Sequence, residues 1–374
     1  MNKKVLTYIA VTIFSFVLLF FWNRYAIDGA EIFAHSAMSE SARIISVEDE
    51  SVTQSGDFTS TLRICRAEIL SGKSKGNTVK VYQEYNTKLP SMDLADVGDK
   101  VIIKNYPMEE MGIYWAVDTY ERTPVLLSLG IIFIFLIILL AKTKGLRTVI
   151  SLIYTCIAVF AIFVPSVLSG KNIYLCAVFI CMFIIAMTLL LVNGCDRKTL
   201  CATLGCIGGV LAAALVTAVF SKVMKFSGYT NEHSYYLTNL PHPVDLGAIA
   251  FSAVIIGAVG AVMDVAMSMA SSLYELNLKA EGISFKSLVS SGLSIGRDMM
   301  GTMANTLVLA YVGSSLSSVL LLCTYADSMA DIFNRELIAH EILQAVAGSI
   351  GIVLTIPLTA LVCGLVYLKG NSKQ

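Results

Sequence analysis

Most of the chain consists of long apolar runs separated by short polar connections. Eight runs are long enough to cross a bilayer, which takes about 20 helical residues. They lie near residues 5–22, 124–141, 147–168, 173–192, 199–221, 246–272, 301–325 and 342–368. The first follows Lys3 and Lys4 and shows no clear cleavage site before or after Arg24, so we predict a retained anchor rather than a signal peptide. The pattern predicts an α-helical polytopic membrane protein with about eight transmembrane helices.

Residues 24–123 have a different pattern, with short segments rich in β-branched residues between Gly, Asn and Pro. Five strands are predicted, near residues 42–47, 61–70, 77–85, 99–106 and 113–121. Five strands in about 80 residues favour a small β-barrel of OB or SH3-like type. The predicted organisation is an N-terminal anchor (1–23), a β-rich domain (24–123) and a seven-span helical domain (124–370).

Charge sets the predicted orientation. With both termini in the cytoplasm, the short inner segments hold twelve Lys and Arg and the short outer loops hold four, as the positive-inside rule requires. The β-rich domain is then extracytoplasmic. Only 14% of the 374 residues are charged, well below the roughly 25% of soluble domains. The formal net charge of zero gives no reason to expect a nucleic-acid partner.

The run over residues 246–272 contains one carboxylate, Asp264. A carboxylate at the centre of a membrane helix costs about 3 kcal/mol on insertion scales. At helical spacing Asp264 shares a face with Gly257, Gly260 and Ser268, so it lies on a stripe of small residues that we predict to face the bundle interior. It is a candidate functional residue, and the alternative is a packing carboxylate satisfied by its neighbours.

A second polar stripe begins just before the run over residues 301–325. It consists of Arg297, Asp298, Gly301, Thr302 and Asn305. We expect this stripe to meet Asp264, because pairing with Arg297 lowers the cost of burying the carboxylate. Gly257, Gly260 and Gly301 are predicted to allow close helix packing. The amphipathic segment before the run, residues 285–300, is expected to lie in the interface or to form a re-entrant turn, and Arg297 and Asp298 would then mark the membrane interface.

The remaining candidate chemistry has simpler explanations. His242 and Asp245 are candidates for a cation or pH-sensing site, but an acidic residue at that position also favours a helix N-terminus. The methionines around Asp264 are attributed to packing, so no metal or cofactor is predicted. The chain has no HExxH motif, and all four histidines lie outside the predicted spans. No enzymatic activity is predicted.

Two stretches, GAVGAVMDVAMSMASSLYEL (257–276) and GLSIGRDMMGTMANTLVLAYVGSSL (292–316), resemble the YibE/F family of bacterial multi-pass membrane proteins. The anchor, the domain of about 100 residues and the seven-span block agree with that resemblance along nearly the whole chain. The resemblance implies a location in the bacterial plasma membrane. It implies no mechanism.

The leading hypothesis is a transporter or permease for a small solute or ion, with proton coupling left open. In it Asp264 accepts a proton or cation, Arg297 and Asp298 form a gating pair, and Thr302 and Asn305 coordinate. The alternative is a non-transporting scaffold that docks partners through the outer domain and residues 273–300. The expected partners are the lipid bilayer and a small solute or ion, and a homo-oligomer or a protein partner is left open.

Overall fold

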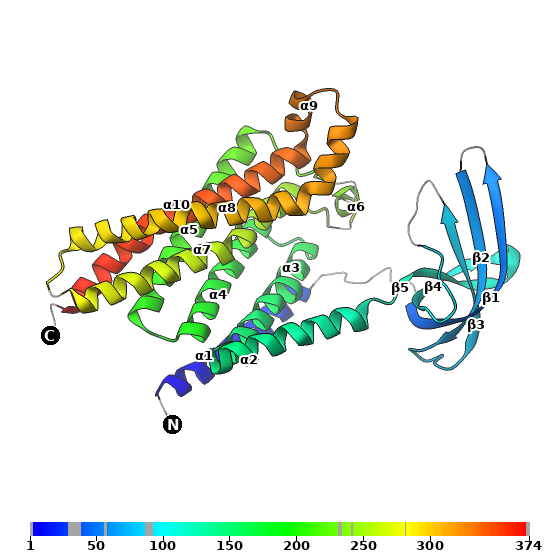
Figure 1. Ribbon diagram of the computed structural model, residues 1–374, viewed down its shortest axis with the longest axis horizontal. Helices are drawn as coiled ribbons and strands as arrows, with labels where there is room; N and C mark the ends of the chain where they lie inside the picture. Colours follow the sequence, from blue (N-terminus) through cyan, green and yellow to red (C-terminus); the bar gives the residue numbers. More distant parts are fainter. Residues whose placement is uncertain are drawn as a thin grey trace. The chain divides into compact units, whose positions relative to one another are not determined.

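The computed structural model describes residues 3–28, 39–55, 58–86, 93–230, 234–240, 242–280 and 282–371. The chain forms two compact units (Figure 1). One comprises Met1–Ile32 and Ile137–Gln374 and is helical, and the other, Phe33–Leu136, contains all the described strands. The boundary between the two units, at residues 136/137, falls inside the first helix after the strands, whereas the sequence predicted it at residues 123/124, where that helix begins.

The strands form a closed barrel in the order β1-β2-β3-β5-β4. Their bounds are β1 (Ser39–Ser55), β2 (Phe58–Ile69), β3 (Thr78–Asn86), β4 (Lys100–Met108) and β5 (Ile113–Tyr120), with a short 3-10 helix, Glu109–Met111, before β5. β3 and β5 pair in parallel and the other neighbours are antiparallel. Alternate residues such as Ala42 and Ile44, and Cys65 and Ala67, fill the core, as the period of two along a strand requires. The predicted small five-stranded structure is confirmed.

Strand β1 is much longer than predicted because polar residues extend it. Glu48 forms ion pairs with Arg66 at 2.6 Å and with Lys80 at 2.8 Å. Glu50 pairs with Arg63 at 2.9 Å. Cross-strand pairs of opposite charge stabilise an antiparallel ladder without any apolar alternation.

Seven helices among the described residues are long and apolar enough to cross a membrane. The helices are α1 (Lys3–Ile27), α2 (Thr123–Cys156), α3 (Val164–Leu168), α4 (Ile173–Asn193), α5 (Arg197–Val223), α6 (Ser234–Thr238), α7 (Leu246–Lys279), α8 (Phe285–Tyr325), α9 (Met329–Asn334) and α10 (Glu336–Asn371), with a π-helix, Ile157–Phe163, between α2 and α3. The short helices α6 and α9 lie in the connections.

Seven rather than eight long helices result because two predicted spans belong to one helical stretch, Thr123–Leu168. Its 46 residues would measure about 69 Å if straight, more than twice the thickness of a hydrocarbon core. The stretch is broken at Lys142, which has φ 50° and ψ −124°. Gly145 lies directly against the Ile137 carbonyl eight residues earlier, a contact that a straight helix excludes. The predicted runs 124–141 and 147–168 are the two sides of this break.

The second half of this stretch is hydrogen-bonded to α1 next to a proline. Pro165 has no N–H, so the carbonyl of Ala161 four residues earlier loses its helical partner. The chain widens into the π-helix just before this proline. The side-chain amide of Asn23 donates a hydrogen bond to the Ala161 carbonyl. The Tyr154 hydroxyl also donates to the carbonyl of Thr12 at 3.1 Å, so α1 is packed into the helical unit.

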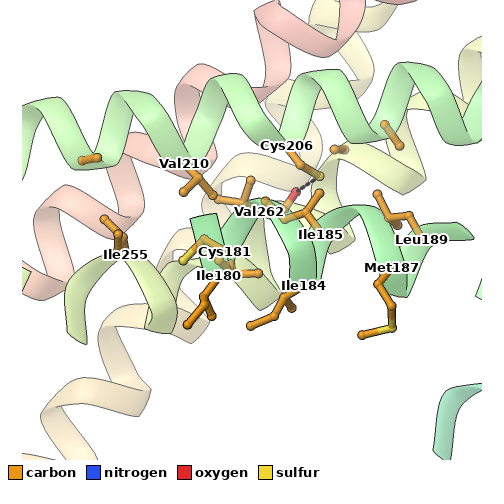
Figure 2. Close-up of a cluster of buried hydrophobic side chains, with 14 of the residues drawn as sticks. Ile180, Cys181, Ile184, Ile185, Met187, Leu189, Cys206, Val210, Ile255 and Val262 are labelled. Carbon is orange, nitrogen blue, oxygen red and sulfur yellow. Dashed lines mark hydrogen bonds between the residues drawn. The ribbon is translucent and has the colours of Figure 1, made fainter. Parts of the chain in front are cut away.

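The core of the helical unit lies where α4, α5 and α7 meet (Figure 2). Ile180, Ile184 and Ile185 of α4 are buried there with Val210 of α5 and Val262 of α7. The Cys206 thiol of α5 donates to the Val262 carbonyl at 3.8 Å, the dashed line in Figure 2.

Helix α10 packs against α5 and α8 through glycines. A Cβ atom at Gly205 or Gly209 of α5 would overlap the side chain of Thr359 or Thr355 of α10. At Gly296 of α8 it would overlap Ile356. These contacts, rather than those of the glycines selected from sequence, bring the helices closest together.

Candidate functional site

Helix α7 starts with a capped N-terminus. The Asp245 carboxylate accepts a hydrogen bond from the Ala248 amide at 3.0 Å, which satisfies one free N–H of the first turn. His242 is exposed before this cap. Across the described ranges no cluster of three or more His, Cys, Asp or Glu side chains is placed to hold a metal ion. The structure therefore gives Asp245 a capping role.

The two faces of α7 differ in size and polarity. The larger apolar residues, among them Ile255, Val262 and Met269, are buried in the helical core. The opposite face is exposed and carries a stripe of mainly small residues: Ala253, Gly257, Gly260, Asp264, Ser268 and Ser272. Sequence analysis found this stripe but predicted that it faces the interior. The larger apolar residues fill the core instead, and the side chain of Asp264 is exposed on the surface of the helical unit.

The second stripe is also exposed, on helix α8. Arg297, Asp298, Gly301, Thr302 and Asn305 all lie on its open face. The Thr302 hydroxyl donates to the carbonyl of Met299 in its own helix at 3.0 Å. Within the described part of the chain, no ion pair joins Asp264 to Arg297.

The residues that α7 and α8 bring together define their register. Gly257 lies against the Tyr311 hydroxyl, and Leu273 lies beside Gly292, where an added Cβ would be 3.0 Å from its methyl carbon. The two helices are therefore antiparallel, and interpolation between these contacts places Asp264 level with Thr302. The predicted pairing of Asp264 with Arg297 stays a prediction, because no hydrogen bond or ion pair joins Asp264 to this stripe among the described side chains.

Helix α8 is one continuous helix of 41 residues, Phe285–Tyr325. The amphipathic segment 285–300 continues without a break into the apolar run, so α8 contains no re-entrant turn. Of the predicted close-packing glycines, only Gly257 has a neighbour near its missing Cβ. The space beside Gly260 and Gly301 is open to 4 Å.

A polar group that sequence analysis missed lies next to Gly257. The hydroxyl of Tyr311 and the amide nitrogen of Gln344 both face this glycine. Glu341 is one turn before Gln344 in α10, and its charge acts on Tyr311. The Tyr311 hydroxyl interacts with Gln344. One Glu341 carboxylate oxygen is buried without a hydrogen-bond partner among the described residues. No single stretch of sequence displays this group, because Tyr311 belongs to α8 whereas Glu341 and Gln344 belong to α10.

One short motif bears on enzymatic alternatives. Residues 292–296 read GLSIG and match the letters of the GxSxG nucleophile motif. That motif requires a sharp strand-to-helix turn, whereas Ser294 lies inside the continuous helix α8. This local geometry provides no nucleophile elbow, so our prediction of no enzymatic activity remains.

A family model described as YibE/F-like protein matches residues 129–369. The chain belongs to the YibE/F-like family. The YibE/F-like match covers α4 to α10 and both polar stripes, and it leaves out the barrel. No curated protein and no solved structure matches the chain. YibE/F-like membership and the apolar helices together indicate a membrane protein.

Proposed function

We propose that this membrane protein transports a small solute or ion along the open face of α7, with Asp264 as the group that accepts a proton or cation. The supporting observation is the exposure of Asp264 on an otherwise small-residue face of a 34-residue apolar helix. A carboxylate facing lipid is costly, so such a group lines water or is covered by another polar surface. A face of Gly, Ala and Ser leaves room for water and solute beside it.

The second stripe supports the same proposal. Thr302 is level with Asp264, and the charged side chains of Arg297 and Asp298 are exposed nearby on α8. Two open polar faces on neighbouring antiparallel helices favour a hydrated path between them. Arg297 and Asp298 control passage in this proposal, and Asn305 coordinates the transported species.

The test is transport by Asp264→Asn. A deletion strain is grown across a panel of metal ions, salts and pH values and complemented with wild type or variant at equal membrane abundance. Purified protein in proteoliposomes is assayed for proton flux under an imposed gradient. We expect Asp264→Asn to lose rescue and flux, because the amide cannot accept a proton or balance a cation's charge.

The control is Asp196→Asn. Asp196 is also an exposed carboxylate, and its side chain makes no capping hydrogen bond at the start of α5. We expect this variant to behave as wild type. Normal rescue and flux by Asp264→Asn would remove the proposed role of Asp264.

A scaffold is the second candidate function, and its supporting observation is an exposed apolar segment among the described residues. In the most apolar 18-residue window of Thr123–Leu168, none of the residues is buried. Lipid satisfies such a surface, and so does a partner helix. A scaffold predicts that removing the barrel abolishes rescue while Asp264→Asn retains it, the reverse of the transport proposal.

A further inference from the structure

A cavity of about 490 Å³ lies at the N-terminal end of α7. It is bounded by the loop after α5, by α6, by the first turns of α7 and by α10. Lining residues from each include Gly228, Tyr236, Leu246, Ala250, Ala253 and His340. Cavities of this volume, mostly apolar with few polar groups, are typical small-molecule sites.

The most unusual group in this cavity is His340. It lies in the second turn of α10, a helix that begins before the predicted span 342–368, and only 8% of its surface is exposed. Phe226 stacks on its ring with the centroids 5.5 Å apart. Its Nδ1 atom has no hydrogen-bond partner in the described part of the chain. An unpaired buried nitrogen destabilises the protein, and a bound molecule with a hydrogen-bonding group would satisfy it.

The cavity is continuous with the proposed transport face. Ala253 lines the cavity and is also the first residue of the exposed stripe on α7. One turn further is Gly257, with the Tyr311 hydroxyl beside it. Asp264 follows about 16 Å from Ala253 along the helix axis. Ala253 therefore links the cavity to the face that carries Asp264, and the Tyr311 hydroxyl lies between them along α7.

Charge indicates which molecules this route accepts. The described lining residues include no Lys or Arg. A carboxylate close to the cavity is that of Glu341, which follows His340 in the chain and has one buried oxygen without a partner among the described residues. Walls of low dielectric strengthen the field of such a group. An apolar cavity with a nearby unpaired carboxylate favours a small organic cation over an anion.

We infer that this cavity is the entry site for a small organic cation, which contacts His340 and is drawn by Glu341 toward the face of Asp264. The inference rests on the proposed transport function and adds the site, the ligand class and two residues. Binding at this site does not require transport, so the two proposals are tested separately.

The experiment measures cysteine labelling in the full-length protein in lipid nanodiscs, where both membrane sides are accessible. Ala253→Cys is reacted with a cationic methanethiosulfonate (the ethyltrimethylammonium reagent) and with its anionic sulfonatoethyl counterpart, and wild-type labelling is subtracted. Val219→Cys is the matched control, because Val219 is exposed on α5 and outside the cavity. Ala250→Cys is a second reporter from the same cavity.

We expect Ala253→Cys to react with the cationic reagent about tenfold faster than Val219→Cys, and several-fold faster than with the anionic reagent after correction for each reagent's rate with a free thiol. Glu341→Gln should remove the charge preference and Glu341→Asp should restore it. n-Butylammonium, a primary ammonium whose N–H groups can donate to the imidazole, should slow labelling, and this protection should be lost in His340→Leu but kept in His242→Leu, which changes an exposed histidine.

Two results would overturn the inference. One is labelling of both cavity reporters no faster than at Val219→Cys in a correctly folded protein, and the other is equal preference for the two reagents. Asp264→Asn should leave labelling unchanged while abolishing transport. Charge-selective labelling in a protein that transports nothing would support the binding site and refute the transport function.

Discussion

Gly257 of α7 lies so close to the Tyr311 hydroxyl of α8 that a Cβ atom at position 257 would overlap it. Gly260, one turn away on the same stripe, has open space beside it. We expect Gly257→Ala to destabilise the fold by about 1–3 kcal/mol through overpacking. Gly260→Ala should instead be neutral or stabilise by up to about 1 kcal/mol, because alanine favours the helix. Thermal unfolding in detergent would compare the two, and equal shifts would contradict this contact.

The break at Lys142 gives a second pair of substitutions with opposite signs. A non-glycine residue at φ 50° is strained, by about 1–3 kcal/mol. Lys142→Gly should therefore stabilise the protein or leave it unchanged. Lys144→Gly should cost about 1 kcal/mol, because Lys144 has helical geometry. Chemical unfolding of both variants measures the difference, and a loss of stability in Lys142→Gly would exclude the break.

Asn23 provides a test of how α1 is held. Asn23→Ala leaves the Ala161 carbonyl, already deprived of its helical partner by Pro165, without a donor. We expect a loss of about 1–3 kcal/mol. Asn334→Ala is the control, because Asn334 is exposed and bonds only to the Ala330 carbonyl in its own helix. Limited proteolysis of the purified variants would show whether α1 is released in Asn23→Ala alone.

The barrel has a testable pH dependence at Glu48. Hydrogen bonds from Lys80, and then from Arg66, hold the pKa of this carboxyl below its ordinary value of 4.5. A lowered pKa stabilises the folded state above pH 4.5, and this contribution is lost as the pH falls below that value.

Glu48, Lys80 and Arg66 are exposed, so the contribution of their ion pairs to stability should be small and should weaken in salt. Barrel unfolding, followed by the fluorescence of Trp115, should change less between pH 7 and pH 3.5 in Glu48→Gln than in wild type. Glu109→Gln is the control, because Glu109 is exposed and has no ion pair among the described side chains. An unchanged pH response in Glu48→Gln would contradict the proposed effect.

The sequence predicted which strands and helices form better than it predicted where they end and which of their faces are buried. Apolar alternation located all five strands, because their inward residues repeat with a period of two. It did not extend β1 to Ser55, since that part is held by ion pairs such as Glu50–Arg63, which become visible only once the strands are aligned.

The candidate site was predicted in part. Helical spacing placed Asp264 on a stripe of small residues, but spacing alone does not say which face the other helices cover. The group around Tyr311 and Glu341 joins α8 and α10, so no single stretch of sequence displays it. His340 is outside the predicted span because the apolar run begins after it, whereas α10 starts at Glu336.

The hydrogen bonds that hold α1 have a consequence for biosynthesis. The carbonyl of Thr12 bonds to Tyr154, 142 residues later, and Asn23 reaches Ala161, 138 residues later. The whole barrel is encoded between these partners. During synthesis the ribosome makes α1 and then the barrel before it reaches Tyr154 and Ala161. Until then α1 has no helix to bind through these hydrogen bonds. Closure of the helical unit is then a late step, and mutations at Asn23 should act on assembly yield as well as on the finished protein.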